Sequence, residues 1–171
     1  ASRRDGNWEI YVLHLDDGRL ARLTDNPAYD GAPAWSPDGT RLAFESYRDG
    51  NLEIYSVAAA GGEAQRLTED PAGDYGPAWS PDGATIAFTS WRDGNKEIYA
   101  VPAAGGEARN LSRHPADDES PAWGSGSALA FVSWRDVDPQ TGNRNAEIYA
   151  LAVPDGGEAQ RLTDNPWPDL D

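Results

Sequence analysis

The chain of 171 residues contains no cysteine and no methionine, and it has two histidines. Without cysteine, disulfides, zinc–thiolate sites and thiol nucleophiles are excluded. His14 and His114 fall at non-equivalent positions of the repeat described below, so we expect no shared metal site or acid–base pair. Gly-x-Ser-x-Gly elbows, His-Glu-x-x-His motifs and glycine-rich phosphate loops are also missing. These absences exclude the usual hydrolase constellations and favour a binding protein over an enzyme.

Positive charge and long apolar runs are scarce as well. Lys and Arg number 14 against 29 Asp and Glu, which gives a formal net charge of −15. A nucleic-acid site or a site for an anionic membrane needs a basic face, so neither partner is expected. No apolar stretch approaches the roughly 20 residues that span a bilayer, so membrane insertion is not expected either. An acidic surface keeps a protein soluble and can attract cations or a basic partner.

An internal repeat dominates the sequence. The tripeptide Glu-Ile-Tyr begins at positions 9, 53, 97 and 147, and Pro-Ala-Trp begins at positions 33, 77 and 121. Each repeat holds four short apolar runs separated by Gly, Pro, Asp and Asn, a pattern typical of a four-stranded antiparallel blade. We therefore predict an all-β fold, a partial or open β-propeller with three complete blades and a two-stranded half-blade.

The repeat sets the expected boundaries along the chain. We assign a half-blade to 1–24, blades to 25–68, 69–112 and 113–163, and a tail to 164–171. Within the second complete blade, strands are expected over 77–80, 85–90, 97–101 and 108–112. The third blade has a shorter first turn and a longer hairpin over 137–145. That longer hairpin is either a binding loop or simple drift of a surface loop.

Apolar residues stand next to one another within the strands, as Ile98 and Tyr99 do. Both faces of each sheet must then be covered, as in a blade between two neighbours. The recurring tryptophans and phenylalanines are therefore assigned to packing between blades and not to ligand stacking. The tyrosine of Glu-Ile-Tyr belongs to the same structural set. The set comprises Trp35, Trp79, Trp123, Phe44, Phe88, Phe131, Tyr11, Tyr55, Tyr99 and Tyr149.

Three aspartates, Asp30, Asp74 and Asp118, recur 44 residues apart, each three residues before the proline of a first strand. By repeat symmetry their loops would meet at one mouth of the central channel, where carboxylates can coordinate Ca²⁺. The alternative is that each aspartate hydrogen-bonds the backbone of its own loop. No other cofactor is expected.

The Asp-Gly-Asn hairpins lack the alternating ligand spacing of an EF-hand, so we interpret them as turns. The arginine before each of these hairpins and the glutamate after it, such as Arg48 and Glu53, are expected to form a surface ion pair.

Several short motifs keep their order and spacing from copy to copy over nearly the whole chain. In one copy they are Pro77-Ala78-Trp79-Ser80-Pro81-Asp82-Gly83, Ile86-Ala87-Phe88, Ser90-Trp91-Arg92-Asp93-Gly94-Asn95 and Glu97-Ile98-Tyr99. This repeat resembles the TolB-like, WD40-like β-propeller repeat. The resemblance implies a periplasmic or extracellular propeller that binds other proteins. Similar repeats also form the propeller that caps the hydrolase domain of prolyl-oligopeptidase-type peptidases.

We therefore expect a non-catalytic, exported interaction scaffold whose partners are proteins, including copies of itself. Two alternatives remain open: a structural subunit of a head-to-tail extracellular polymer, and a fragment of the gating propeller of a peptidase.

The strand count predicts that the isolated chain of 171 residues is not a stable monomer. The half-blade would carry an unpaired strand edge, and the last blade would carry an uncovered apolar face. Further residues of a longer parent chain, or copies joined head to tail, must cover these surfaces. Size exclusion coupled to light scattering tests the prediction, and a well-folded species of 18.4 kDa at micromolar concentration would contradict it.

Overall fold

The computed structural model describes residues 1–137, 142, 144–153 and 157–164. These residues form β-strands joined by turns and include no helix that could cross a membrane. A two-stranded sheet consists of β1 (Tyr11–Leu13) and β2 (Leu20–Arg22). The first four-stranded sheet contains β3 (Asp30–Trp35), β4 (Arg41–Ser46), β5 (Glu53–Ala58) and β6 (Gln65–Arg66).

The other two sheets repeat this order of strands. The second contains β7 (Asp74–Trp79), β8 (Thr85–Ser90), β9 (Glu97–Pro102) and β10 (Arg109–Asn110). The third contains β11 (Asp118–Trp123), β12 (Ala128–Val137), β13 (Arg144–Ala152) and β14 (Gln160–Arg161). Every pair of neighbouring strands is antiparallel. The predicted fold class, three four-stranded blades and a half-blade, is confirmed.

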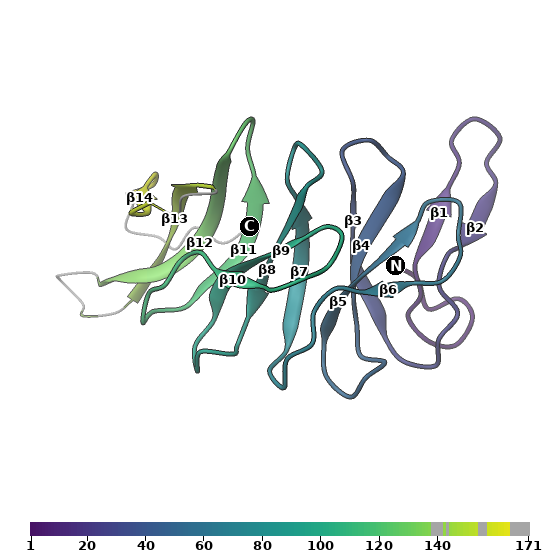
Figure 1. The fold of residues 1–171 in the computed structure, drawn as a ribbon, viewed down its shortest axis with the longest axis horizontal. Coiled ribbons are helices and arrows are strands. Elements are labelled where there is room, and N and C mark those ends of the chain that lie inside the picture. The colour runs from purple at the N-terminus through teal and green to yellow at the C-terminus, as the bar shows by residue number, and fades with distance from the viewer. Residues whose placement is uncertain (138–141, 143, 154–156, 165–171) are drawn as a thin grey trace.

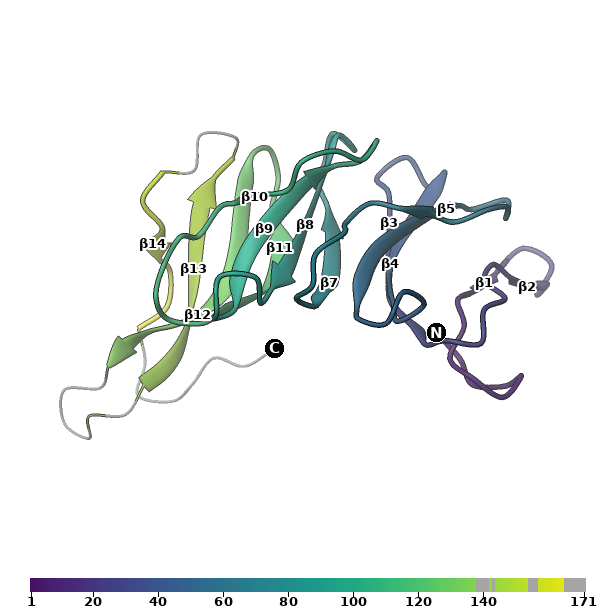
Figure 2. The same cartoon turned by 60° about the horizontal axis from the view of Figure 1, so that its bottom comes forward.

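The sheets stand side by side in sequence order, from the two-stranded sheet at one end to the third blade at the other (Figure 1). A view turned by 60° shows the same sheets following one another along the molecule in this order (Figure 2). In the second and third blades the first strand makes the contact with the blade before it, since β7 lies against β3, β4 and β5, and β11 lies against β7, β8 and β9. These two blades are therefore positioned chiefly through their first strands.

That first strand begins earlier than the sequence predicts. In the second blade, β7 starts at Asp74, which pairs with Ser90, and a bulge interrupts the ladder between Tyr75 and Ala78. Gly76, inside the bulge, has a φ of 63°. The equivalent residues Ala32 and Ser120 also have positive φ, at 44° and 56°. Asp and Gly are poor strand formers, so sequence pattern alone places the start of this strand at the proline.

The lengthened hairpin of the third blade is partly described. β12 and β13 continue beyond their equivalents and pair Asp136 with Asn145 and Val137 with Arg144, after a break in register. Residues 138–141 and 143 of the predicted loop lie outside the described residues, as do 165–171 of the predicted tail.

The core consists of apolar clusters between successive sheets. Phe44, Phe88 and Phe131 are buried at its centre. Trp79 is 9% exposed, and its indole N–H donates to the carbonyl of Ala34 in the preceding blade at 3.1 Å. Trp123 makes the same bond to Ala78 at 3.1 Å and is half-buried. These residues therefore pack between blades.

Trp35 departs from that prediction, because it is 49% exposed. The two-stranded sheet before it supplies equivalents of the third and fourth strands of a blade, and among the described residues no first strand stands beside Trp35. The indole therefore lacks the carbonyl that Trp79 and Trp123 use.

The recurring tyrosines lie beside the buried phenylalanines. Ring centroids are 5.8 Å apart in Phe44–Tyr55, 6.1 Å in Phe88–Tyr99 and 6.3 Å in Phe131–Tyr149. Each tyrosine hydroxyl donates to the hairpin aspartate of its own blade, as Tyr99 does to Asp93. Burial raises the pKa of Tyr99 to about 12, and Asp93 acts in the same direction. Tyr11, in the half-blade, is less enclosed and bonds to Asp5.

Burial predicts a large difference between two tryptophans of one blade. Trp79→Ala should lower the free energy of unfolding by about 3 to 5 kcal/mol, because it leaves a cavity between blades. Trp91 is 44% exposed at a hairpin, so Trp91→Ala should cost about 1 kcal/mol or less. Matched urea melts of the two variants measure the difference, and equal losses would contradict the packing described above.

Candidate interaction surface

The three aspartates singled out by the sequence are buried ion-pair partners. Each opens a first strand, has no exposed surface and accepts hydrogen bonds from the arginine that precedes the hairpin of its own blade. The pairs are Arg48–Asp30 at 3.0 Å, Arg92–Asp74 at 2.7 Å and Arg135–Asp118 at 2.8 Å. The hairpin arginine therefore pairs with this aspartate, and the expected pairing of Arg48 with Glu53 is wrong.

The arginine is fixed by two further contacts. In the second blade, Nε of Arg92 donates to the hydroxyl of Ser90 at 2.9 Å, and the guanidinium lies 4.4 Å from the ring centroid of Tyr99. Burial raises the pKa of Asp74, while the charge of Arg92 opposes that shift. The pair thus holds the first strand to the hairpin of the same sheet.

The calcium site at these aspartates stays a prediction. One carboxylate oxygen of Asp74 and one of Asp118 lack a hydrogen-bond partner among the described residues. In the same part of the chain, however, no group of three or more His, Cys, Asp or Glu side chains is placed to hold a metal ion. Calcium would have to compete with the arginine of each blade, which gives these carboxylates a structural role without metal.

A second buried carboxylate recurs at Glu9, Glu53, Glu97 and Glu147. Glu53 and Glu97 open β5 and β9, Glu9 lies just before β1, and Glu147 lies within the longer β13. Glu53 accepts hydrogen bonds from Asn51 Nδ2 at 3.1 Å, from Arg66 at 3.0 Å and from the backbone N–H of Asp70 at 3.0 Å. Its other oxygen accepts from the hydroxyl of Thr68 at 2.6 Å. Four donors therefore compensate the buried charge.

The asparagine of the hairpin joins this network to the loop that leads to the next blade. Nδ2 of Asn51 also donates to the carbonyls of Asp70 at 2.7 Å and Ala72 at 3.0 Å. Asn95 makes the same bonds to His114 and Ala116. The sequence carried the signal, because Asn stands two residues before Glu in all four repeats. Reading the Asn only as a turn residue missed its role.

The third copy of the network differs in one donor. Asn110 replaces the arginine found at positions 22, 66 and 161. Burial would raise the pKa of Glu9, but hydrogen bonds from Thr24, Asn7 and Arg22 outweigh it and the pKa is lowered. For Glu97, which has no such arginine, burial dominates and the pKa is raised.

These networks fix a rim that carries exposed aromatic side chains. Tyr47 and Trp91 directly follow β4 and β8, and Trp134 has the equivalent position within the longer β12. Their backbone N–H groups donate to the loop before the first strand, to Tyr29 at 2.9 Å, Gly73 at 3.3 Å and Asp117 at 2.9 Å. Tyr47 and Trp91 are exposed, and Trp134 is half-buried. One aromatic side chain is thus presented at the same place on three consecutive blades.

Polar contacts connect the aromatic positions of the second and third blades. Nζ of Lys96 lies 5.5 Å from the ring centroid of Trp91 and 2.6 Å from Glu119. The indole N–H of Trp134 donates to the same carboxylate at 3.2 Å. Exposed aromatic residues with ordered polar neighbours are typical of protein interfaces. This rim is the candidate interaction surface, and the sequence analysis did not single it out, since one copy has a tyrosine where the other two have tryptophan.

Two family models match the sequence. Residues 54–166 match the Tricorn protease N-terminal beta propeller domain, and residues 1–76 match the TolB beta propeller domain. A TolB homolog of Chlorobium luteolum is 50% identical over 46 residues, which are 27% of this chain and 11% of that protein. The matched segment is therefore about a tenth of that curated relative.

Solved structures show the same arrangement. The putative TolB of Agrobacterium tumefaciens has a TM-score of 0.77 and 31% identity, covering 94% of this chain and 58% of that one. A puromycin-hydrolyzing peptidase of Mycobacterium tuberculosis has a TM-score of 0.69 and 18% identity, covering 95% of this chain and 25% of that one. At this lower identity the likeness shows the fold alone.

The buried pair predicts the effect of removing its arginine. Arg92→Gln should lower the free energy of unfolding by about 3 kcal/mol, because it leaves the carboxylate of Asp74 buried without its ion-pair partner. In the Asp74→Asn background the same change should cost clearly less. Arg113→Gln, at an exposed arginine three residues after β10, is the control and should change stability by about 0.5 kcal/mol or less. Urea melts measure all four variants, and equal costs of Arg92→Gln in both backgrounds would contradict the pairing.

Proposed function

The chain belongs to the TolB-like β-propeller family, and on this premise we propose that it is a non-catalytic scaffold that binds proteins through its aromatic rim. The proposal rests on one observation: backbone hydrogen bonds of the blades hold Tyr47, Trp91 and Trp134 at equivalent places, where Tyr47 and Trp91 are exposed and Trp134 is half-buried. Tyrosine and tryptophan supply large contact area at low entropic cost, which makes them frequent hot spots. We further propose export to the periplasm or the extracellular space, as expected for the family.

The charge of the chain indicates the chemistry of the partner. With a net charge of −15, the surface favours approach of a basic protein and disfavours nucleic acid. Steering by such a field raises association rates at low ionic strength. The proposed partner is therefore a basic protein surface that buries the aromatic side chains of the rim.

Self-association is a second part of the proposal. Leu67 and Leu111 lie between blades and are each 5% exposed, whereas the equivalent Leu162 is 60% exposed on the outer face of the third blade. At the other end, Leu13 in β1 and Leu15 just after this strand are exposed as well. We propose that a further blade covers these faces, supplied either by a copy of this chain or by a longer polypeptide that contains it.

A second candidate function is the gating propeller of a larger peptidase. The match of residues 54–166 to the Tricorn protease propeller favours it. In that case catalysis belongs to another part of the polypeptide, and a Gly-x-Ser-x-Gly elbow in the parent reading frame would support it.

Site-specific photo-crosslinking tests the rim. A crosslinking amino acid at position 91 should capture a protein partner in cells, whereas the same group at the exposed Ala84, in a turn between β7 and β8, should not. Trp91→Ser combined with Trp134→Ser should weaken binding of the captured partner by about tenfold or more, because hot-spot truncation removes buried contact. Equal crosslinking from both positions would count against the rim.

A further inference from the structure

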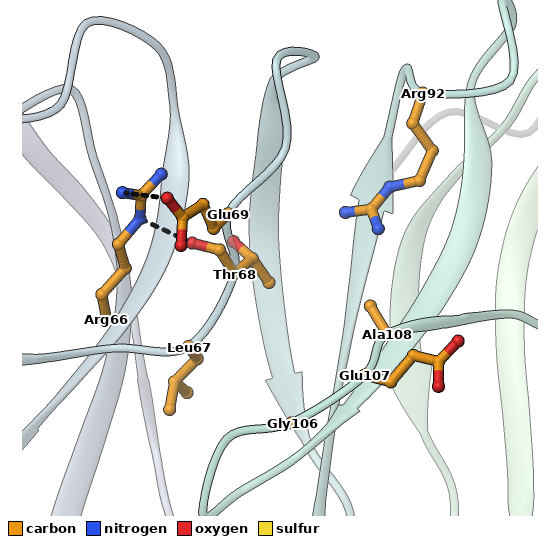
Figure 3. Close-up of a pocket in the computed structure, with 8 residues that line it drawn as sticks. All are labelled: Arg66, Leu67, Thr68, Glu69, Arg92, Gly106, Glu107 and Ala108. Atoms are coloured by element: carbon orange, nitrogen blue, oxygen red, sulfur yellow. Dashed lines mark hydrogen bonds and ion pairs between the residues drawn. The ribbon is translucent and has the colours of Figure 1, made fainter.

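Similar pockets lie between the outer strands of successive blades. Figure 3 shows the pocket between the first and second blades, about 490 Å³ in volume, with Arg66 and Arg92 on opposite walls. Glu69 lies next to Arg66, at 3.7 Å, so this pocket carries its own carboxylate beside the arginine. The equivalent pocket between the second and third blades is larger, about 610 Å³.

In the pocket between the second and third blades, the charge at the position equivalent to Glu69 is reversed. In three of the four repeats an arginine is followed three residues later by an acid that pairs with it. The pairs are Arg22–Asp25 at 2.7 Å, Arg66–Glu69 at 3.7 Å and Arg161–Asp164 at 2.8 Å. In the remaining repeat Asn110 replaces the arginine and Arg113 replaces the acid. An arginine therefore stands where the other repeats place a carboxylate.

Arg113 is held in place but has no ionic partner among the described residues. Its backbone N–H donates to Asn110 Oδ1 at 2.9 Å, and its Nε donates to the Asn110 carbonyl at 3.2 Å. Its φ is 45°, a left-handed conformation that is costly for an arginine. The local bonds thus fix the base of the side chain, while the terminal nitrogens remain available to a ligand.

His114 supplies a second donor. It occupies the position of Asn26 and Asp70, whose side-chain oxygens accept the amide two residues later. Nδ1 of His114 accepts the N–H of Ala116 at 3.1 Å in the same way. A neutral imidazole that accepts at Nδ1 carries its proton on Nε2. Burial lowers the pKa of His114, and nearby Arg135 adds to the effect, so this neutral form is favoured at pH 7.

The other cations that line this pocket already have partners. Arg135 pairs with Asp118 at 2.8 Å, and Arg161 pairs with Glu147 at 2.9 Å. The residues that line this pocket include three arginines and one carboxylate, that of Glu158. The apolar part of the pocket wall is formed by Leu111, Tyr149 and Ala159.

We propose that this pocket binds a carboxylate, held by the guanidinium of Arg113 and the Nε2–H of His114. A guanidinium donates two parallel hydrogen bonds to a planar carboxylate, and the imidazole adds a third. The ligand restores from outside the arginine–carboxylate contact that the other repeats make internally. Its source is either a free carboxylate or an acidic side chain of a peptide. The inference does not depend on binding of a partner at the aromatic rim.

Isothermal titration calorimetry at pH 7, in low salt and in a buffer without carboxylates, tests the proposal with two probes. Succinate represents the free ligand, and an acetylated, amidated tri-aspartate peptide represents the peptide source. Succinamide, which has the same length and no charge, should not bind. Arg113→Glu, which restores the acid of the other repeats, should weaken binding by about tenfold or more, since charge-assisted hydrogen bonds are lost.

Two matched variants separate binding from folding. His114→Asn restores the residue of other repeats and keeps the acceptor for Ala116, so it should weaken binding without changing the melting temperature. Glu69→Gln, in the equivalent pocket, should leave binding unchanged. Binding of succinate supports a free ligand, and binding of the peptide alone supports a peptide source. Failure of both probes at millimolar concentration, or unchanged affinity in a folded Arg113→Glu variant, would overturn the proposal.

Discussion

The rest of the structure depends on the hydrogen bonds of the buried glutamate that recurs in the Glu-Ile-Tyr motif of each repeat. A carboxylate without exposed surface is costly unless several donors surround it. At Glu53 those donors come from the hairpin, the fourth strand and the loop toward the next blade. The same residue therefore closes its own blade and fixes the start of the following one. Thr68, which donates to Glu53, also lies close to Asp74, the first residue of the next blade's first strand.

This arrangement separates the residues that build the rim from those that are free to vary. The hairpin arginine, asparagine and aspartate all have partners inside the repeat, as Arg92, Asn95 and Asp93 show. The residue just before the arginine takes part in the fold of its own blade through its backbone N–H, so the identity of its side chain can vary. It is Tyr47 in one blade and Trp91 in the next. A rigid scaffold with one variable, solvent-facing position per blade suits recognition, because changing that side chain leaves the fold intact.

Sequence reasoning succeeded where a feature is local and repeated. The second strand of the second blade was placed at 85–90, and β8 has those bounds, because apolar periodicity and an Asp-Gly turn define both ends. It failed where a feature depends on residues distant in the chain. Asp74 and Arg92 are 18 residues apart, so no motif signals their pairing. Trp35 shares its motif with Trp79, yet burial depends on whether a first strand stands beside it. A repeated motif predicts the same burial for every copy, although the residues that surround each copy in the fold differ.

The third repeat shows how a departure from the pattern becomes informative once the network is known. Replacing the usual arginine by Asn110 removes a donor from Glu97, whose pKa burial then raises. By itself, this replacement only destabilises the buried charge of Glu97. Here an arginine reappears three residues later, with a left-handed backbone conformation, on the wall of a pocket. The equivalent pocket between the first and second blades has Glu69 at this position. Local rules are commonly broken at functional sites, where stability is exchanged for binding. The swap of Asn110 and Arg113 has this character, since one substitution weakens the scaffold and the other creates a cation without an internal partner among the described residues.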